Sequence, residues 1–119
     1  METNFTNAPE LLAHALESGR LPLLLSQLQK DYERANIAFP LKGTDPAGLG
    51  PGEILQGLQE SLYVLLMERF DGYLNLMYAA DVPERDFKSV RPTDVVEVAA
   101  QVAFLLLKRE WQKVAYRSR

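Results

Sequence analysis

Few residues in this sequence have the types and spacings that catalysis or metal binding requires. The chain contains no cysteine and a single histidine, His14. Thiol nucleophiles, cysteine-ligated zinc and iron–sulfur clusters are therefore excluded, as are the paired Glu-x-x-His motifs of di-iron bundles. His14 falls opposite the apolar stripe of its helix, near Glu10 and Glu17, so we expect it to be exposed with acidic neighbours. The sequence predicts no catalytic residue, no metal ligand and no cofactor.

A second candidate for chemistry is the segment 36–52, which contains three prolines and four glycines and leads into a helix. Free N–H groups at a helix N-terminus can hold an anion. A phosphate-binding P-loop, however, needs a strand followed by G-x-x-x-x-G-K-[ST], whereas the Lys-Gly-Thr of residues 42–44 precedes the other glycines. We interpret the segment as a connector whose apolar side chains Ile37, Phe39 and Leu41 pin it to the core.

Arg69 breaks the pattern of its helix because it falls in the middle of an apolar stripe, between Leu65 and Tyr73. A buried charge without a partner is costly, so we expect Arg69 to be partly buried and to face an acidic side chain, or to extend its head to water. The functional interpretation is a pocket for a small anionic ligand. Arg69, Tyr73 and Tyr63 would line it, and residues 36–52 would form its roof.

Phe104 breaks its pattern in the opposite sense, because it lies on the one polar line of the last helix. That line consists of Glu97, Gln101, Lys108 and Gln112. Trp111 falls two turns further along nearly the same line, and large aromatic side chains on a polar face indicate an interface. The alternative is that residues 36–52, or Phe5 in the N-terminal segment, cover these aromatic rings.

The end of the same helix changes character after Leu107. The side that is apolar before this point carries four charged residues after it: Arg109, Glu110, Lys113 and Arg117. We therefore expect the last turns to project past the core. Trp111, Val114 and Tyr116 would then be available to contact a second subunit.

The elements that position these residues are predicted to be helices. The first begins at the N-cap Asn7, with Glu10 completing a capping box, and ends at Gly19. The second begins at Pro22, and so short a connection predicts an antiparallel pair. The third is one long helix over Glu53–Ala80, because its apolar stripe keeps its phase through Gly72, where a kink is possible.

The fourth helix runs from about Asp94 to Tyr116 and is apolar almost all round in its first half, which is typical of a central helix. The sequence contains no sustained alternation of apolar and polar residues, so it predicts no strand. The expected fold is therefore all-α: a single four-helix, bundle-like domain over residues 1–119. Its second and third helices are joined by the long Gly/Pro-rich loop. The length of 119 residues and the 47% hydrophobic content suit one core.

The charge distribution and the N-terminal sequence bear on partners and location. Residues 1–82 hold five basic and eleven acidic side chains, whereas residues 83–119 hold eight and five, for a net charge of −3. An acidic protein is a poor nucleic-acid binder, although the basic C-terminal third leaves this as the weakest alternative. The polar N-terminus and the lack of a long apolar run predict a cytoplasmic protein without a membrane segment.

The leading functional hypothesis is a non-enzymatic interaction protein. It would form a homodimer, or bind another protein, through the last helix. The interface candidates are Phe104, Trp111, Val114 and Tyr116. The alternative is a small anionic-ligand binder, or an enzyme, that uses the pocket around Arg69, Tyr73 and Tyr63.

Overall fold

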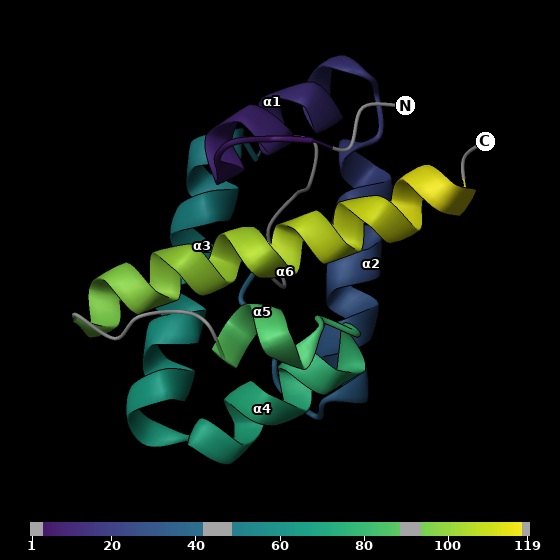
Figure 1. The fold of residues 1–119 in the computed structure, drawn as a ribbon. Coiled ribbons are helices and arrows are strands. Elements are labelled where there is room, and N and C mark those ends of the chain that lie inside the picture. The colour runs from purple at the N-terminus through teal and green to yellow at the C-terminus, as the bar shows by residue number, and fades with distance from the viewer. Residues whose placement is uncertain (1–3, 42–48, 89–93, 118–119) are drawn as a thin grey trace.

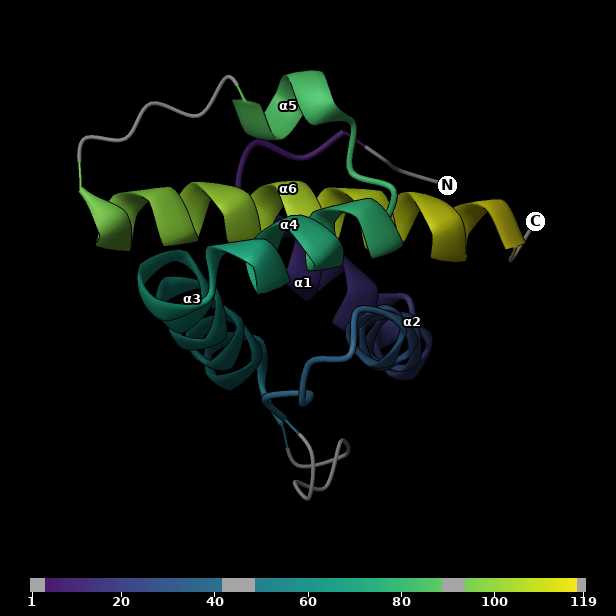
Figure 2. The ribbon, with the colours of Figure 1, turned by 90° about the horizontal axis from the view of Figure 1, so that it is seen from below.

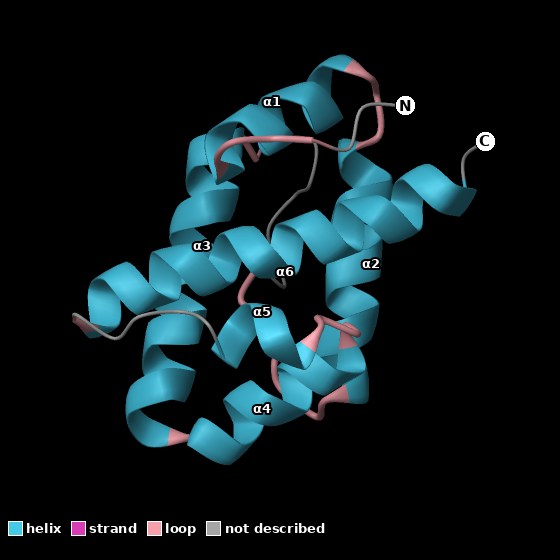
Figure 3. Cartoon of the chain, viewed as in Figure 1, coloured by secondary structure: helices cyan, strands magenta, loops and turns pink. Residues whose placement is uncertain are grey.

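The computed structural model describes residues 4–41, 49–88 and 94–117. Helices make up the regular structure of these residues, and no strand occurs among them (Figures 1 and 3). Six helices follow one another: α1 (Ala8–Glu17), α2 (Leu21–Arg34), α3 (Pro51–Glu68), α4 (Phe70–Ala79), α5 (Glu84–Lys88) and α6 (Val95–Arg117). The all-α prediction is confirmed, but the described chain has six helices where four were expected.

Helix α1 begins and ends as the sequence predicts. The Asn7 side chain accepts a hydrogen bond from the backbone N–H of Glu10 at 2.9 Å, and Gly19 follows the helix with a positive φ of 73°. Only three residues separate α1 from α2. Figure 1 shows α2 leaving α1 at a steep angle, so the expected antiparallel pair does not form.

The predicted long third helix is interrupted at Arg69. Its backbone has φ −144° and ψ 67°, which is outside the helical region, so α3 ends at Glu68 and α4 begins at Phe70. Gly72, the predicted site of a kink, lies inside α4 and is buried. A Cβ atom there would lie 3.3 Å from Cδ2 of Leu65, so the glycine permits α4 to fold back closely onto α3.

Helix α6 crosses the whole molecule, with its first residues near α3 and its last near α2 (Figures 1 and 2). It contacts α1, α2, α3 and α5, so the prediction of a central helix is confirmed. The core contains fully buried side chains from α6 itself and from four other helices: Leu11, Leu24, Leu58, Leu62, Leu76, Met77, Val102 and Leu106. Burial of these groups is the main favourable contribution to folding.

The described part of the connector packs as expected. Leu41 is buried, Ile37 and Phe39 are half-buried against the core, and the Phe39 ring lies 5.5 Å from that of Tyr32. Residues 42–48, with the Lys-Gly-Thr motif, lie outside the described residues. Among the helices that the structure describes, none combines the length and the apolar content needed to cross a lipid bilayer.

Candidate functional site

An exposed apolar surface lies where α3 passes the beginning of α6. It is formed by Tyr63, Val64 and Met67 of α3, which are 39%, 46% and 57% exposed, and by Val96 of α6, which is 69% exposed. We call these four residues the α3–α6 face. Single exposed apolar residues are normal on a protein, but a contiguous group of large ones marks an interaction site.

Helical periodicity explains why α3 presents apolar side chains on two sides. At 100° per residue, Leu58, Leu62 and Leu65 point in one direction and are buried. Tyr63, Val64 and Met67 fall on the opposite side of the same helix. The small side chains of Ala99 and Ala100 in α6 lie beside the face and line an open hollow of about 500 Å³.

The charged side chains among the described residues that line the α3–α6 face are acidic. The 500 Å³ hollow includes Glu60, and a second hollow, of about 590 Å³, includes Asp94 and Glu97. Asp94 caps α6, because its carboxylate accepts a hydrogen bond from the backbone N–H of Glu97 at 2.8 Å. Among the described residues that line the two hollows, none is basic. The face therefore combines an apolar centre with a negative rim.

Two of the four predicted interface residues lie instead inside the chain's own core. Trp111 has no exposed surface and Val114 is buried, so the expectation that they are available on a projecting helix end is wrong. The Phe5 ring lies 6.4 Å from that of Trp111, which confirms the alternative that the N-terminal segment covers this tryptophan. Phe104 is half-buried beneath the ammonium group of Lys108, and Tyr116 is 71% exposed.

His14 is also placed differently from its prediction. It is half-buried, and its ring centroid lies 5.5 Å from the centroids of both Phe5 and Trp111. The expectation of an exposed histidine among acidic neighbours is therefore wrong. The helical pattern of α1 alone could not show it, because the covering side chains come from the N-terminal segment and from α6.

The structure does not bring the three predicted pocket residues together. Arg69 is exposed at the break between α3 and α4, so the prediction of a partly buried arginine is wrong. The change in backbone direction removes it from the apolar stripe on which the prediction rested. Tyr63 belongs to the α3–α6 face, whereas Tyr73 is buried and lines a cavity on α4.

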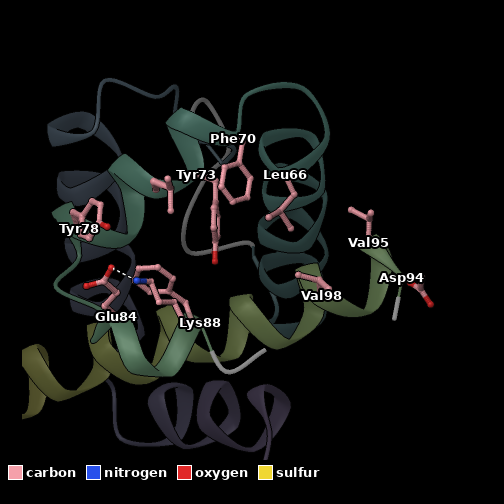
Figure 4. A pocket seen from close by; sticks show the side chains of 11 residues that line it. Leu66, Phe70, Tyr73, Tyr78, Glu84, Lys88, Asp94, Val95 and Val98 are labelled. Carbon is pink, nitrogen blue, oxygen red and sulfur yellow. Dashed lines mark ion pairs between the residues drawn. The ribbon is translucent and has the colours of Figure 1, made fainter. Parts of the chain in front are cut away.

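This cavity has a volume of about 720 Å³ and lies between α4, α5 and the beginning of α6 (Figure 4). Its walls are mostly aromatic and aliphatic and include Leu66, Phe70, Tyr73, Phe87 and Val98. The rings of Tyr73 and Phe87 meet edge to face, with their centroids 6.2 Å apart. Helix α5 contributes Glu84, Phe87 and Lys88 to the lining, whereas residues 36–41 and 49–52 of the expected roof do not line the cavity and residues 42–48 lie outside the described residues.

A third candidate site is a cluster of charged groups that is buried between α2 and the end of α6. The side chains of Asp31 and Glu110 are fully buried and that of Lys113 is 11% exposed. The Lys113 ammonium nitrogen lies 2.7 Å from Oδ2 of Asp31 and 3.0 Å from Oε1 of Glu110. One cation thus lies between two carboxyl groups.

The two carboxyl groups respond differently to this environment. Burial, together with the adjacent Asp31, raises the pKa of Glu110 to about 9, so Glu110 is an uncharged acid at neutral pH. Burial alone would raise the pKa of Asp31, but the Glu110 and Lys113 groups beside it bring that pKa below its usual value. At neutral pH the cluster therefore contains one carboxylate, one carboxylic acid and one ammonium group.

Polar neighbours extend the cluster toward the C-terminal end of α6. Arg117 donates a hydrogen bond to the Gln27 side-chain oxygen at 2.7 Å, and Gln27 donates one to Asp31 at 3.3 Å. The last turns of α6 are therefore held against α2, so the prediction that they project past the core is wrong. A hollow of about 110 Å³ reaches Gln27 and Arg117 but neither carboxyl group, so we assign the cluster a structural role.

Among the described residues, no group of three or more histidine, aspartate or glutamate side chains has the arrangement of a metal site. Comparisons with protein-family models, with curated proteins and with solved structures found no match to this chain.

Proposed function

We propose that this protein is a non-enzymatic interaction module that binds a helical segment of another protein at the α3–α6 face. The observation that supports this proposal most directly is the joint exposure of Tyr63, Val64, Met67 and Val96. Large apolar and aromatic side chains are the residues that contribute most to binding when a partner covers them.

The acidic rim indicates the chemistry of the partner. An amphipathic helix that places leucine-like side chains on the apolar centre, and lysine or arginine beside Glu60 and Glu97, would complement the face in shape and charge. A second copy of this chain is less well matched. A twofold interface places the same patch on both subunits and would bring two acidic rims together. We therefore favour a different protein over the homodimer.

The proposal keeps the last helix as part of the binding surface but moves the contact to its other end. The sequence pointed to Trp111, Val114 and Tyr116 near the C-terminus of α6, of which the first two are buried. Val96 and Tyr116 lie at opposite ends of α6 and are 69% and 71% exposed. Substitutions at these two positions form a matched pair that distinguishes the two ends.

The test uses an 18-residue amphipathic peptide of leucine and lysine as the probe, with titration calorimetry as the measurement. We expect the chain to bind it, and Val96→Lys to weaken binding about tenfold or more, because the substitution adds a positive charge to the apolar centre. Tyr116→Lys should change the affinity less than about twofold. A leucine and glutamate peptide of the same pattern should bind more weakly than the lysine peptide, because the rim is negative.

Three results would contradict the proposal. The first is a lack of binding by the lysine peptide, and the second is equal loss of affinity in the two lysine variants. The third concerns self-association and comes from sedimentation velocity. If the chain alone forms a dimer that Val96→Lys separates and Tyr116→Lys does not, the α3–α6 face binds a second copy rather than another protein.

A further inference from the structure

Tyr73 contributes a polar hydroxyl group to the mostly apolar lining of the cavity beneath α5, which also includes Tyr78, Glu84, Lys88 and Asp94. Tyr73 is 4% exposed, and its ring is held between Phe70 and Phe87 at centroid distances of 5.3 and 6.2 Å. Figure 4 shows the Tyr73 hydroxyl pointing into the cavity, away from α4. The neighbouring rings fix the orientation of this hydroxyl, so a ligand can bind to it without a rearrangement of the side chain.

No described residue forms a hydrogen bond with the Tyr73 hydroxyl. The Tyr73 hydroxyl is not among the buried polar atoms that lack a partner, so it is open to the cavity and can bond to a group that enters there. Burial raises the pKa of Tyr73 to about 12, so the hydroxyl keeps its proton at neutral pH. It can therefore donate a hydrogen bond to a ligand oxygen.

Among the residues that the structure describes, the charged groups at the cavity mouth do not favour an anion. The Lys88 ammonium group lies 2.7 Å from Oε1 of Glu84, so its charge is already compensated (Figure 4). Asp94 caps α6 and its carboxylate points away from the cavity. Arg69, the cation expected there from the sequence, does not line the cavity. The walls and mouth together suit an uncharged guest.

We infer that the cavity binds a neutral small molecule with an aromatic or alicyclic body and one carbonyl, ether or hydroxyl oxygen that accepts a hydrogen bond from Tyr73. The volume of about 720 Å³ lies within the range of about 300–1,000 Å³ that is usual for small-molecule sites. The rings of Phe70 and Phe87 would contact the apolar body of the ligand. The inference is independent of the proposed protein partner, because Tyr73 lies outside the α3–α6 face.

Three naphthalene probes of similar size test the ligand class. The first is 2-acetonaphthone, which carries a carbonyl oxygen, and the second is 2-isopropenylnaphthalene, a hydrocarbon of nearly the same shape. The third is the anion 2-naphthoate. Their dissociation constants are measured by titration while the methyl NMR signals of Leu74 and Val98, which line the cavity, are followed. We expect the ketone to bind most tightly and the naphthoate most weakly.

The variant Tyr73→Phe removes the hydroxyl and keeps the ring, so the fold should persist. We expect the dissociation constant of the ketone to rise about 3- to 10-fold, as for the loss of one neutral hydrogen bond. The hydrocarbon should bind with an affinity within about twofold of that for the unsubstituted chain. Val96→Lys should leave ketone binding unchanged, which separates this cavity from the α3–α6 face.

A second variant fills the cavity. Val98→Trp should abolish binding of all the neutral probes. The control Leu23→Trp adds the same side chain at an exposed position of α2 and should have no effect. The inference is overturned if no probe shifts the cavity signals or if 2-naphthoate binds most tightly. It is also overturned if Tyr73→Phe weakens ketone and hydrocarbon equally. Should Val98→Trp lose its helical circular dichroism, the Tyr73→Phe comparison decides alone.

Discussion

The two ends of helix α6 reverse the usual relation between polarity and burial. Near its beginning the apolar side chain of Val96 is 69% exposed, while near its end Glu110 and Lys113 are 0% and 11% exposed. The difference follows from the neighbours of each end. The first turns lie against α3, which leaves the Val96 side exposed, and the last turns lie against α2, which supplies Asp31 as a partner for Lys113 (Figure 2).

This contrast separates two kinds of information in one helix. Buried charged groups remain in a core only when they are paired or neutralised, and here both occur, because Lys113 pairs with Asp31 while Glu110 is protonated. Exposed apolar groups lower stability little, so they persist where a partner uses them. The charged end therefore contributes to the fold, and we propose that the apolar end contributes to binding.

The largest expected effect comes from removing the buried cation. Lys113→Met keeps much of the side-chain volume but leaves the Asp31 carboxylate buried without its closest cation. We expect the free energy of unfolding at pH 7 to fall by about 3 kcal/mol. Urea denaturation followed by circular dichroism measures it. Lys30→Met, at an exposed position of α2, is the control and should change stability by less than about 0.5 kcal/mol. A similar loss in both variants would refute a structural role for the cluster.

The pH dependence of the unfolding free energy tests the role of the buried charged cluster in a second way. The pKa of Glu110 is about 9 in the folded chain against 4.5 as its ordinary value, so folding takes up a proton between these two pH values. The stabilising contribution is therefore fully present below pH 4.5 and is lost as the pH rises toward 9. Glu110→Gln removes this dependence.

We expect the unfolding free energy of the unsubstituted chain to fall, relative to that of Glu110→Gln, by about 3 kcal/mol between pH 6 and 8.5. Urea denaturation across this pH range provides the measurement. Parallel pH profiles for the two proteins would show that Glu110 is already ionised in the folded state.

A smaller effect is expected where the N-terminal segment covers the end of α6. Phe5→Ala removes a half-buried ring that lies 6.4 Å from the ring of Trp111. We expect a loss of about 1 kcal/mol in stability, a shift of the tryptophan emission to longer wavelength and faster quenching by iodide. Tyr116→Ala should leave the emission unchanged. Easy quenching of Trp111 in the unsubstituted chain would place its ring at the surface, against this structure.

The smallest effect is expected at Arg69. Its side chain is exposed at the break between α3 and α4, so Arg69→Ala should change the unfolding free energy by less than about 0.5 kcal/mol. A loss of 2 kcal/mol or more in urea denaturation would instead support the buried, paired arginine that the apolar stripe predicted.

The sequence predicted those helices and helix ends that depend on residues close to one another in the chain. The cap at Asn7, the end of α1 at Gly19 and the apolar stripe of the central helix all depend on residues within a few positions of one another. The break at Arg69 was missed because the stripe keeps its phase across it. The close approach of Leu65 to Gly72 that accompanies the break is visible only in three dimensions.

The candidate sites were predicted less well than the helices. One pattern in the sequence does indicate the buried charged cluster. Gln27 and Asp31 lie four residues apart beside the buried Leu24 and Leu28, so they share a face that points inward. No comparable signal marks Glu110, whose partner Lys113 meets Asp31 across 82 positions of sequence.

The amino-acid sequence by itself determined that this chain is helical, where most of its helices begin, and that cysteine and paired-histidine chemistry are absent. Tertiary structure alone decided which sides of the helices are covered: it buried Trp111 and Glu110 and left Met67 and Val96 in water. The physical reason is that helix formation is governed by short-range backbone hydrogen bonds and side-chain spacing. Burial depends on contacts between segments that are far apart in the chain.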